Sequence, residues 1–174
     1  MNTMRDEFFR AYGSAMFAWQ EVETALFKLY HSMNVLYGES DIMRSAELYY
    51  KKKTFGSKLE LVKKLAPVVD VNRFVDWNSL ESDLKAASGI RNSLAHRPAQ
   101  LEELPDGTIR LVFGEPIFKP ISLREMPVLA FQYDTNRCVE FCCDFKCLAQ
   151  RVDEAHRQIP HQFANNKLIV EREK

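Results

Sequence analysis

The amino-acid sequence predicts an all-α protein, a bundle of about five helices with a small β-hairpin inserted before the last helix. Apolar residues recur at spacings of three and four over long stretches at both ends of the chain, as on the buried face of a helix. Turn residues and a short alternating segment interrupt this pattern between residues 99 and 135. The 174 residues are enough for one domain with a buried core.

The composition is that of an ordinary globular domain. Apolar residues make up 46% of the chain and charged residues 28%. We therefore expect a single domain over 1–174, with its core at about 5–160 and the hairpin insertion at about 99–135. Lysine plus arginine equals aspartate plus glutamate, 24 each, so attraction to nucleic acid would need a local basic patch.

We expect neither a signal peptide nor a membrane span in this sequence. Its first residues, Met1 to Glu7, become charged at once, and the apolar run Met126–Phe131 is short and contains a proline. All four cysteines fall within Cys138–Cys147, which is not a framework that joins distant loops. We expect a cytoplasmic protein without membrane contact.

The first predicted helix covers residues 5–37 and ends at Gly38. Its apolar face consists of Phe8, Tyr12, Ala15, Trp19, Val22, Leu26, Leu29, Met33 and Leu36. A second stripe beside this face consists of Phe9, Met16, Glu23, Tyr30 and Tyr37. Glu23 is its one carboxylate, and in such surroundings a carboxylate needs a partner.

Two shorter helices should follow, one capped by Ser40 and one at Lys58–Ala66, where Ser57 and Glu60 fit a capping box. The stretch 44–64 holds seven basic and two acidic residues, a local net charge of +5. The residues expected to contact an RNA backbone are Lys51, Lys52, Lys53 and Lys58. A solvated face without a ligand is the alternative interpretation.

The fourth predicted helix runs from about Asn72 to His96 and stops before Pro98. Its apolar face consists of Trp77, Leu80, Leu84, Ala87, Arg91 and Leu94. An arginine on such a face is costly unless its charge is paired, so we expect Glu23 to face Arg91 across the bundle. The alternative is a purely structural salt bridge that ties the two helices together.

The insertion and the last helix complete the pattern. Pro105-Asp106-Gly107 predicts a turn, and Ile109–Phe113 alternates as a half-buried strand does. A second turn at Gly114-Glu115-Pro116 should lead into a strand at Ile117-Phe118. The last helix is expected at about Asn136–Ile159, with an apolar face of Phe141, Phe145, Leu148, Val152, Ala155 and Ile159.

Polar residues with chemical potential gather at the end of the fourth helix. Asn92 and His96 are four positions apart and share a face, with Ser88 one turn below. Arg91 and His96 point about 140° apart on an ideal helix, but the length of arginine can bring both to one spot. A helix C-terminus favours a protonated imidazole, which suits a general acid, although His96 could also be a simple helix cap.

The segment Arg91-Asn92-Ser93-Leu94-Ala95-His96 resembles the signature of the HEPN superfamily. In this signature a polar residue follows the arginine directly, and four positions separate the arginine from the histidine. The pattern Trp19…Glu23, the Thr54-Phe55…Lys58 segment and the insertion before the last helix are similar to many members. The resemblance covers roughly residues 5–160.

This resemblance implies a helical bundle that forms a homodimer with both motifs in one cleft. It also implies a metal-independent endoribonuclease whose products carry a 2′,3′-cyclic phosphate and a 5′-hydroxyl. In these roles Arg91 holds the phosphate, His96 transfers protons and Asn92 organises hydrogen bonds, with Glu23 and Ser88 in support. General acid–base catalysis beside a guanidinium accounts for such cleavage without a metal or cofactor. Many such proteins belong to toxin–antitoxin or phage-defence systems.

The chain departs from one toxin branch of the superfamily, which has a tyrosine two positions after the histidine where this chain has Pro98.

Several alternatives stay open. The protein could be a non-catalytic HEPN module that binds a nucleotide, RNA or a protein, or it could be held inactive by an antitoxin-like partner. We read the cysteine cluster as small buried side chains rather than as a metal site, because its i, i+4 pairs lie on two faces of one helix.

Overall fold

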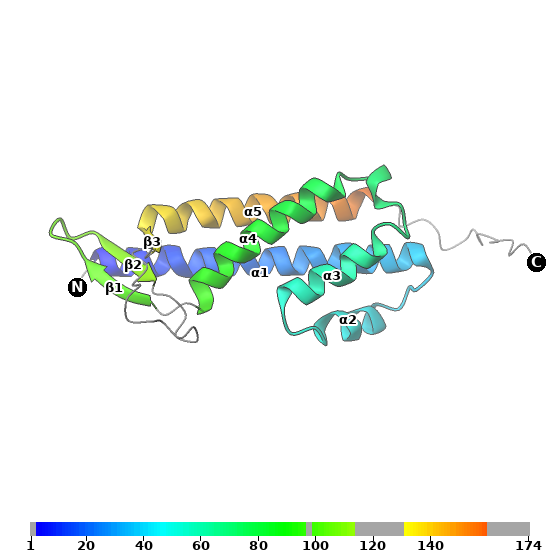
Figure 1. The fold of residues 1–174 in the computed structure, drawn as a ribbon, viewed down its shortest axis with the longest axis horizontal. Coiled ribbons are helices and arrows are strands. Elements are labelled where there is room, and N and C mark those ends of the chain that lie inside the picture. The colour runs from blue at the N-terminus through cyan, green and yellow to red at the C-terminus, as the bar shows by residue number, and fades with distance from the viewer. Residues whose placement is uncertain (1–2, 97–98, 114–130, 160–174) are drawn as a thin grey trace, which may run out of the picture. The chain divides into compact units, whose positions relative to one another are not determined.

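The computed structural model describes residues 3–96, 99–113 and 131–159 (Figure 1). Within these ranges the structure is mostly helical, as predicted, with a small antiparallel sheet before the last helix. The elements in chain order are α1 (Thr3–Tyr37), α2 (Ile42–Tyr50), α3 (Phe55–Leu65), the 3₁₀ turn Val71–Arg73, α4 (Trp77–His96), β1 (Ala99–Glu103), β2 (Ile109–Phe113), β3 (Phe131–Asp134) and α5 (Thr135–Gln158). Across the described ranges, every helix is too short or too polar to cross a membrane.

The chain divides into two compact units. The first consists of Met1–Val22 and Asp83–Ala149, and the second of Glu23–Ser82 and Gln150–Lys174. The first unit therefore holds the sheet and the end of α4 that carries Arg91 and His96. The second holds α2, α3 and the basic stretch.

The apolar pattern of α1 is confirmed. All the residues of its predicted face are buried except Tyr12 and Leu36, which are partly exposed. In the first unit, Trp19 packs edge-on against Phe145 of α5, with ring centroids 5.3 Å apart. Gly38 ends the helix with a φ of +102°, a left-handed conformation that glycine adopts without strain. The second stripe is less buried than the first, since Phe9 and Tyr37 are exposed.

The caps of the two short helices differ from the predicted ones. Asp41, not Ser40, caps α2, because its carboxylate accepts hydrogen bonds from the amides of Met43 and Arg44. Thr54 caps α3 and forms a capping box with Ser57, so the helix begins earlier than expected. Ser57 was predicted as the cap because it precedes Glu60 by three; in the structure it occupies the third helical position instead.

Helix α4 begins at Trp77 rather than near Asn72, and the 3₁₀ turn Val71–Arg73 lies before it, separated from it by residues 74–76. Asp76 accepts a hydrogen bond from the amide of Ser79, as an N-terminal cap does. The apolar face is buried at each predicted position except Arg91, which is half-buried.

The sheet packs in the first unit against α1 and α5. Its strand order is β1-β2-β3, with both pairs antiparallel and Leu111 opposite Leu101 and Tyr133. The predicted turn at Pro105-Asp106-Gly107 joins β1 to β2, and Gly107 has a φ of +84°. The strands lie beside the first turns of α1 (Figure 1), where a cluster of buried residues joins them to both helices: Phe8, Ala11, Ile109 and Cys138.

The predicted pairing of the hairpin strands differs from the pairing in the structure. The strand at 109–113 exists, but its described partners are 99–103 and 131–134, neither of which was expected. The predicted turn at 114–116 and strand at 117–118 lie outside the described residues. The last helix agrees with its prediction within one residue at each end, and its whole apolar face is buried.

Candidate functional site

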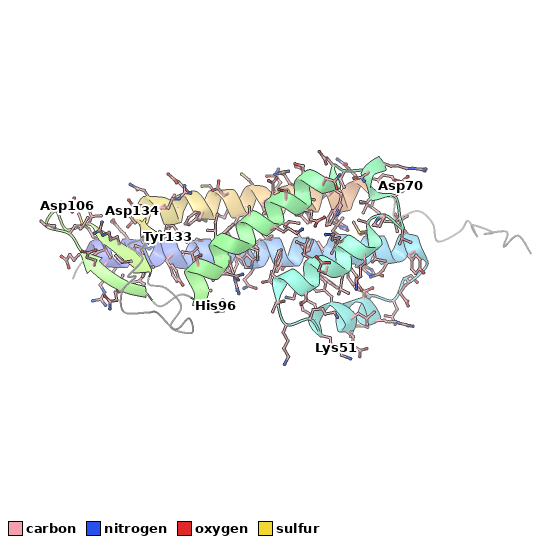
Figure 2. The ribbon with its side chains drawn as sticks, viewed as in Figure 1. Lys51, Asp70, His96, Asp106, Tyr133 and Asp134 are labelled. Atoms are coloured by element: carbon pink, nitrogen blue, oxygen red, sulfur yellow. The ribbon has the colours of Figure 1, made fainter. Side chains whose placement is uncertain are left out.

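The last turns of α4 bring together the three polar residues of the motif. Nη1 of Arg91 lies 3.2 Å from Oδ1 of Asn92 and 3.1 Å from Nε2 of His96. Asn92 and His96 are exposed, and His96 lies at the C-terminal end of α4 (Figure 2). Arg91 and His96 start from different faces of the helix, but the arginine side chain is long enough to reach the histidine. A single guanidinium nitrogen therefore contacts both Asn92 and His96.

The contact places a ring nitrogen of His96 against the guanidinium of Arg91. A guanidinium has donors and no acceptor, so a hydrogen bond between the two side chains uses Nε2 of the imidazole as its acceptor. The same nitrogen is the atom that would accept a proton from a substrate once a ligand takes its place at the guanidinium.

A buried donor of the guanidinium lacks a partner in the described part of the chain. Nε of Arg91 is buried and has no hydrogen-bond partner among the residues that the structure describes. A buried donor without a partner costs about 1–3 kcal/mol, so such groups call for an explanation. A ligand oxygen that drew the side chain outward would give this donor a partner.

Tyr12 of α1 holds the end of α4. Its hydroxyl donates a hydrogen bond to the carbonyl of Leu94 across 2.9 Å. This carbonyl is among the last four of the helix, which have no partner within it. Burial raises the pKa of Tyr12, the Cys138 thiol adds to this, and the nearby Arg91 guanidinium offsets part of it. The phenol therefore stays protonated and remains a donor at neutral pH.

The serines around the motif take different positions. Ser88 is half-buried one turn below Asn92, and the hydroxyl of Ser93 donates to the carbonyl of Gly89 across 3.1 Å. The Ser93 contact is a local bond within the helix and leaves the exposed face to Asn92 and His96.

Glu23 has a partner that the sequence did not suggest. Its carboxylate pairs with the ammonium of Lys58, and the two side chains are only 18% and 12% exposed. Both residues belong to the second unit. The expected contact between Glu23 and Arg91 joins residues of different units and stays a prediction.

The predicted RNA-binding lysines separate into two kinds. Lys51, Lys52 and Lys53 are exposed after the end of α2, where Lys51 is labelled in Figure 2. Lys58 instead points at Glu23 and lies over the rings of Tyr49 and Tyr50. Its charge is used within the protein, so the charge offered to a ligand is that of the three consecutive lysines.

The cysteines have unequal environments. Cys138 is buried, and burial raises the pKa of its thiol to about 11. Cys142 is half-buried, whereas Cys143 and Cys147 are exposed. Cys142 and Cys143 line an open cleft of about 440 Å³ that Arg10 of α1 and Val139 of α5 also border. Within the described ranges, no three His, Cys, Asp or Glu side chains are grouped as a metal site would need.

Sequence reasoning missed Tyr12 and Tyr50. Tyr12 belongs to the predicted apolar face of the first helix. A buried tyrosine hydroxyl needs a hydrogen-bond partner, so its presence on such a face indicates a polar contact as well as apolar packing. Tyr50 stands directly before three lysines, and this neighbourhood of an aromatic ring and positive charges was the available signal.

No family model matches the chain, and no curated protein or solved structure matches it either.

Proposed function

We propose that the protein is a metal-independent endoribonuclease of the HEPN type, with Arg91, Asn92 and His96 as its catalytic residues. The observation that carries this proposal is the 3.1 Å contact between Nη1 of Arg91 and Nε2 of His96 on an exposed helix end. This contact brings a basic nitrogen next to a guanidinium. Attack of a ribose 2′-oxygen on the adjacent phosphorus requires both groups, one to take the proton and one to stabilise the phosphate charge.

The proposed reaction begins when a phosphate of the RNA displaces His96 from the guanidinium. Nε2 of the imidazole then accepts the proton of the ribose 2′-hydroxyl, and the 2′-oxygen attacks the adjacent phosphorus. The bond from phosphorus to the 5′-oxygen breaks, which leaves a 2′,3′-cyclic phosphate on one product. The 5′-oxygen takes up a proton and becomes a 5′-hydroxyl. Arg91 stabilises the charge on the phosphate oxygens throughout, and Asn92 helps to hold the guanidinium by accepting a hydrogen bond from Nη1.

A second copy of the chain completes the site in this proposal. The reaction needs one group to remove a proton and one to supply it, and a single imidazole cannot do both in the same step. A homodimer with both chain copies' motifs in one cleft would provide a second imidazole as the acid. An antitoxin-like partner that covers this cleft, and a role in toxin–antitoxin or phage-defence systems in the cytoplasm, belong to the same proposal.

One observation favours a second candidate function. Arg91 donates to two side chains of its own helix, so the motif is partly satisfied without any substrate. This would suit a non-catalytic HEPN module that keeps the motif for architecture and binds a nucleotide, RNA or protein partner elsewhere.

The two candidates differ in their dependence on the ribose 2′-hydroxyl. The test is incubation of the purified protein with a labelled RNA and with the same RNA carrying a single 2′-deoxy substitution at the cleaved position. The endoribonuclease cuts the first substrate and leaves the second intact at that position. Binding of both without any cut, over a panel of RNA sequences, would instead establish the binding module.

A further inference from the structure

Tyr50 presents an aromatic ring to solvent from a rigid support. The residue is 58% exposed at the end of α2, although tyrosine usually buries much of its ring. Its ring packs against Phe27 and Tyr49, each with centroids 5.3 Å away, at interplanar angles of 39° and 84°. Nζ of Lys58 lies 5.6 Å from its centroid. These contacts fix the ring while leaving much of it accessible.

Positive charge is concentrated directly after this ring. Of the seven basic residues between positions 44 and 64, three are paired with carboxylates: Arg44 with Glu39, Lys58 with Glu23 and Lys63 with Glu81. Lys51, Lys52 and Lys53 are exposed and form no salt bridge with the described part of the chain. Of the four basic residues outside these pairs, three are consecutive and directly follow Tyr50, and the fourth, Lys64, is exposed on α3.

We propose that Tyr50 and Lys51–Lys53 form a binding site for single-stranded RNA in the second unit, with the tyrosine ring stacking on a base and the lysines contacting phosphates. This proposal rests on the proposed function in taking RNA as the ligand, but it concerns binding rather than cleavage. An aromatic surface beside a basic track is the combination by which proteins hold single strands without reading their sequence.

The chemistry favours a single strand over other anionic ligands. A base in a duplex has both faces covered by its neighbours, so a ring on the protein surface cannot stack on it. An acidic peptide would satisfy the lysines but would not need the exposed ring. The direct succession of ring and charges matches a ligand in which aromatic and anionic groups alternate at short intervals.

The first arm of the test introduces a fluorescent reporter at the site. Trp19 and Trp77 are nearly fully buried, so Tyr50→Trp adds the exposed indole. Addition of a single-stranded oligoribonucleotide should quench this indole and leave the affinity equal to or higher than that of the unmodified protein. Tyr37→Trp is the matched control, since Tyr37 is 64% exposed on α1. Equal quenching of both variants, or quenching of neither, would overturn the proposal.

The second arm measures affinity by fluorescence anisotropy in the His96→Ala background, so that the RNA stays whole. Tyr50→Ala should weaken binding about tenfold, while Tyr37→Ala leaves it unchanged. Replacing all three lysines by alanine should weaken binding and reduce the slope of log K against log salt by about 2, given about 0.7 per phosphate contact for a single strand. An unchanged slope, or displacement of the RNA by an acidic peptide at equal concentration, would contradict the site.

The two proposals can fail separately. Quenching at Tyr50→Trp together with absent cleavage would retain the RNA-binding site and remove the nuclease. Cleavage that needs His96 but is unaffected by Tyr50→Ala or by the lysine changes, at RNA concentrations below saturation, would retain the nuclease and remove this site.

Discussion

The hydroxyl of Tyr12 donates a hydrogen bond to the carbonyl of Leu94 across 2.9 Å and so ties α1 to the last turn of α4. Leu94 stands between Arg91 and His96 in the sequence. The carbonyl would otherwise lack a partner at the helix end, where the backbone frays most readily. Tyr12 therefore acts on the candidate site through the backbone and is a positioning residue.

Tyr12→Phe tests whether the position of the end of α4 matters for activity when the catalytic side chains are unchanged. The change removes one hydrogen bond and keeps the ring, so we expect a loss of about 0.5–1.5 kcal/mol in the free energy of unfolding. RNA cleavage should fall although Arg91 and His96 are intact. Denaturant unfolding and initial rates measure the two effects. Tyr37→Phe, at an exposed position, is the control, and an equal loss in both variants would argue against the role of Tyr12.

The pairing of Glu23 is open to a double-mutant cycle. Glu23→Gln and Lys58→Met should each destabilise the protein by about 1–3 kcal/mol, because each leaves one charge of a largely covered pair without its partner. The double variant should lose less than the sum of the two. The same cycle with Glu23→Gln and Arg91→Met tests the contact expected from the sequence. A coupling energy larger for Arg91 than for Lys58 would show that Glu23 serves the motif first.

Long apolar patterns were predictable because burial sets them. The faces of α1 and α5 each repeat over about five turns or more, and a single polar residue such as Tyr12 does not obscure the period. The angle between Arg91 and His96 was also predictable, since it follows from helix geometry, and the length of arginine closes it.

Most of the features that the sequence did not predict depend on contacts between residues far apart in the chain. The β1 segment Ala-Gln-Leu-Glu-Glu has little strand propensity by itself, and its pairing with β2 makes it a strand. Lys58 and Glu23 are 35 positions apart, and nothing in the local pattern joins them. The cap of α3 was misassigned because Thr54 and Ser57 both suit that position, and only the backbone decides between them.

Asp153 should make stability depend on acid pH. The hydrogen bond from Lys28 lowers the pKa of this carboxyl, and the charges of Lys28 and Arg157 act in the same direction, while partial burial opposes them. A lowered pKa means that the carboxylate stabilises the folded state above its ordinary pKa of about 4 and that this contribution is lost as pH falls through the lower, folded value.

We expect Asp153→Asn to cost about 0.2–1 kcal/mol at pH 7, since Lys28 is half-exposed and solvent screens the pair. The difference from the unmodified protein should shrink as the pH is lowered below about 4. Urea unfolding at a series of pH values measures it. A constant difference between pH 7 and pH 2.5 would mean that the pair does not act through its charge.

The cysteines should react in the order of their exposure. Cys143 and Cys147 are expected to react first with a thiol reagent at neutral pH, followed by Cys142. Cys138 should react only on unfolding, because it is buried and its pKa is raised to about 11, which leaves almost no thiolate. Mass spectrometry of the labelled peptides gives the order, and early labelling of Cys138 in the folded protein would contradict the packing of the sheet against α1 and α5.

Arg91→Lys should preserve the charge of the motif but not its geometry. A lysine ammonium is a point charge and cannot hold Asn92 and a phosphate through a planar fork of donors. We expect the rate of RNA cleavage to fall by about 10²-fold or more, close to the effect of Arg91→Ala. Measured cleavage at near-normal rates in Arg91→Lys would reduce the role of the arginine to long-range electrostatics.

The most direct measurement of the central claim is the incubation of end-labelled RNA with the purified protein in EDTA, beside His96→Ala. We expect the unmodified protein to produce fragments with 2′,3′-cyclic phosphate ends and His96→Ala to produce none, with both proteins equally folded by circular dichroism. Equal cleavage by the two proteins, or no cleavage by either over a broad panel of RNA substrates, would contradict a catalytic pair of Arg91 and His96.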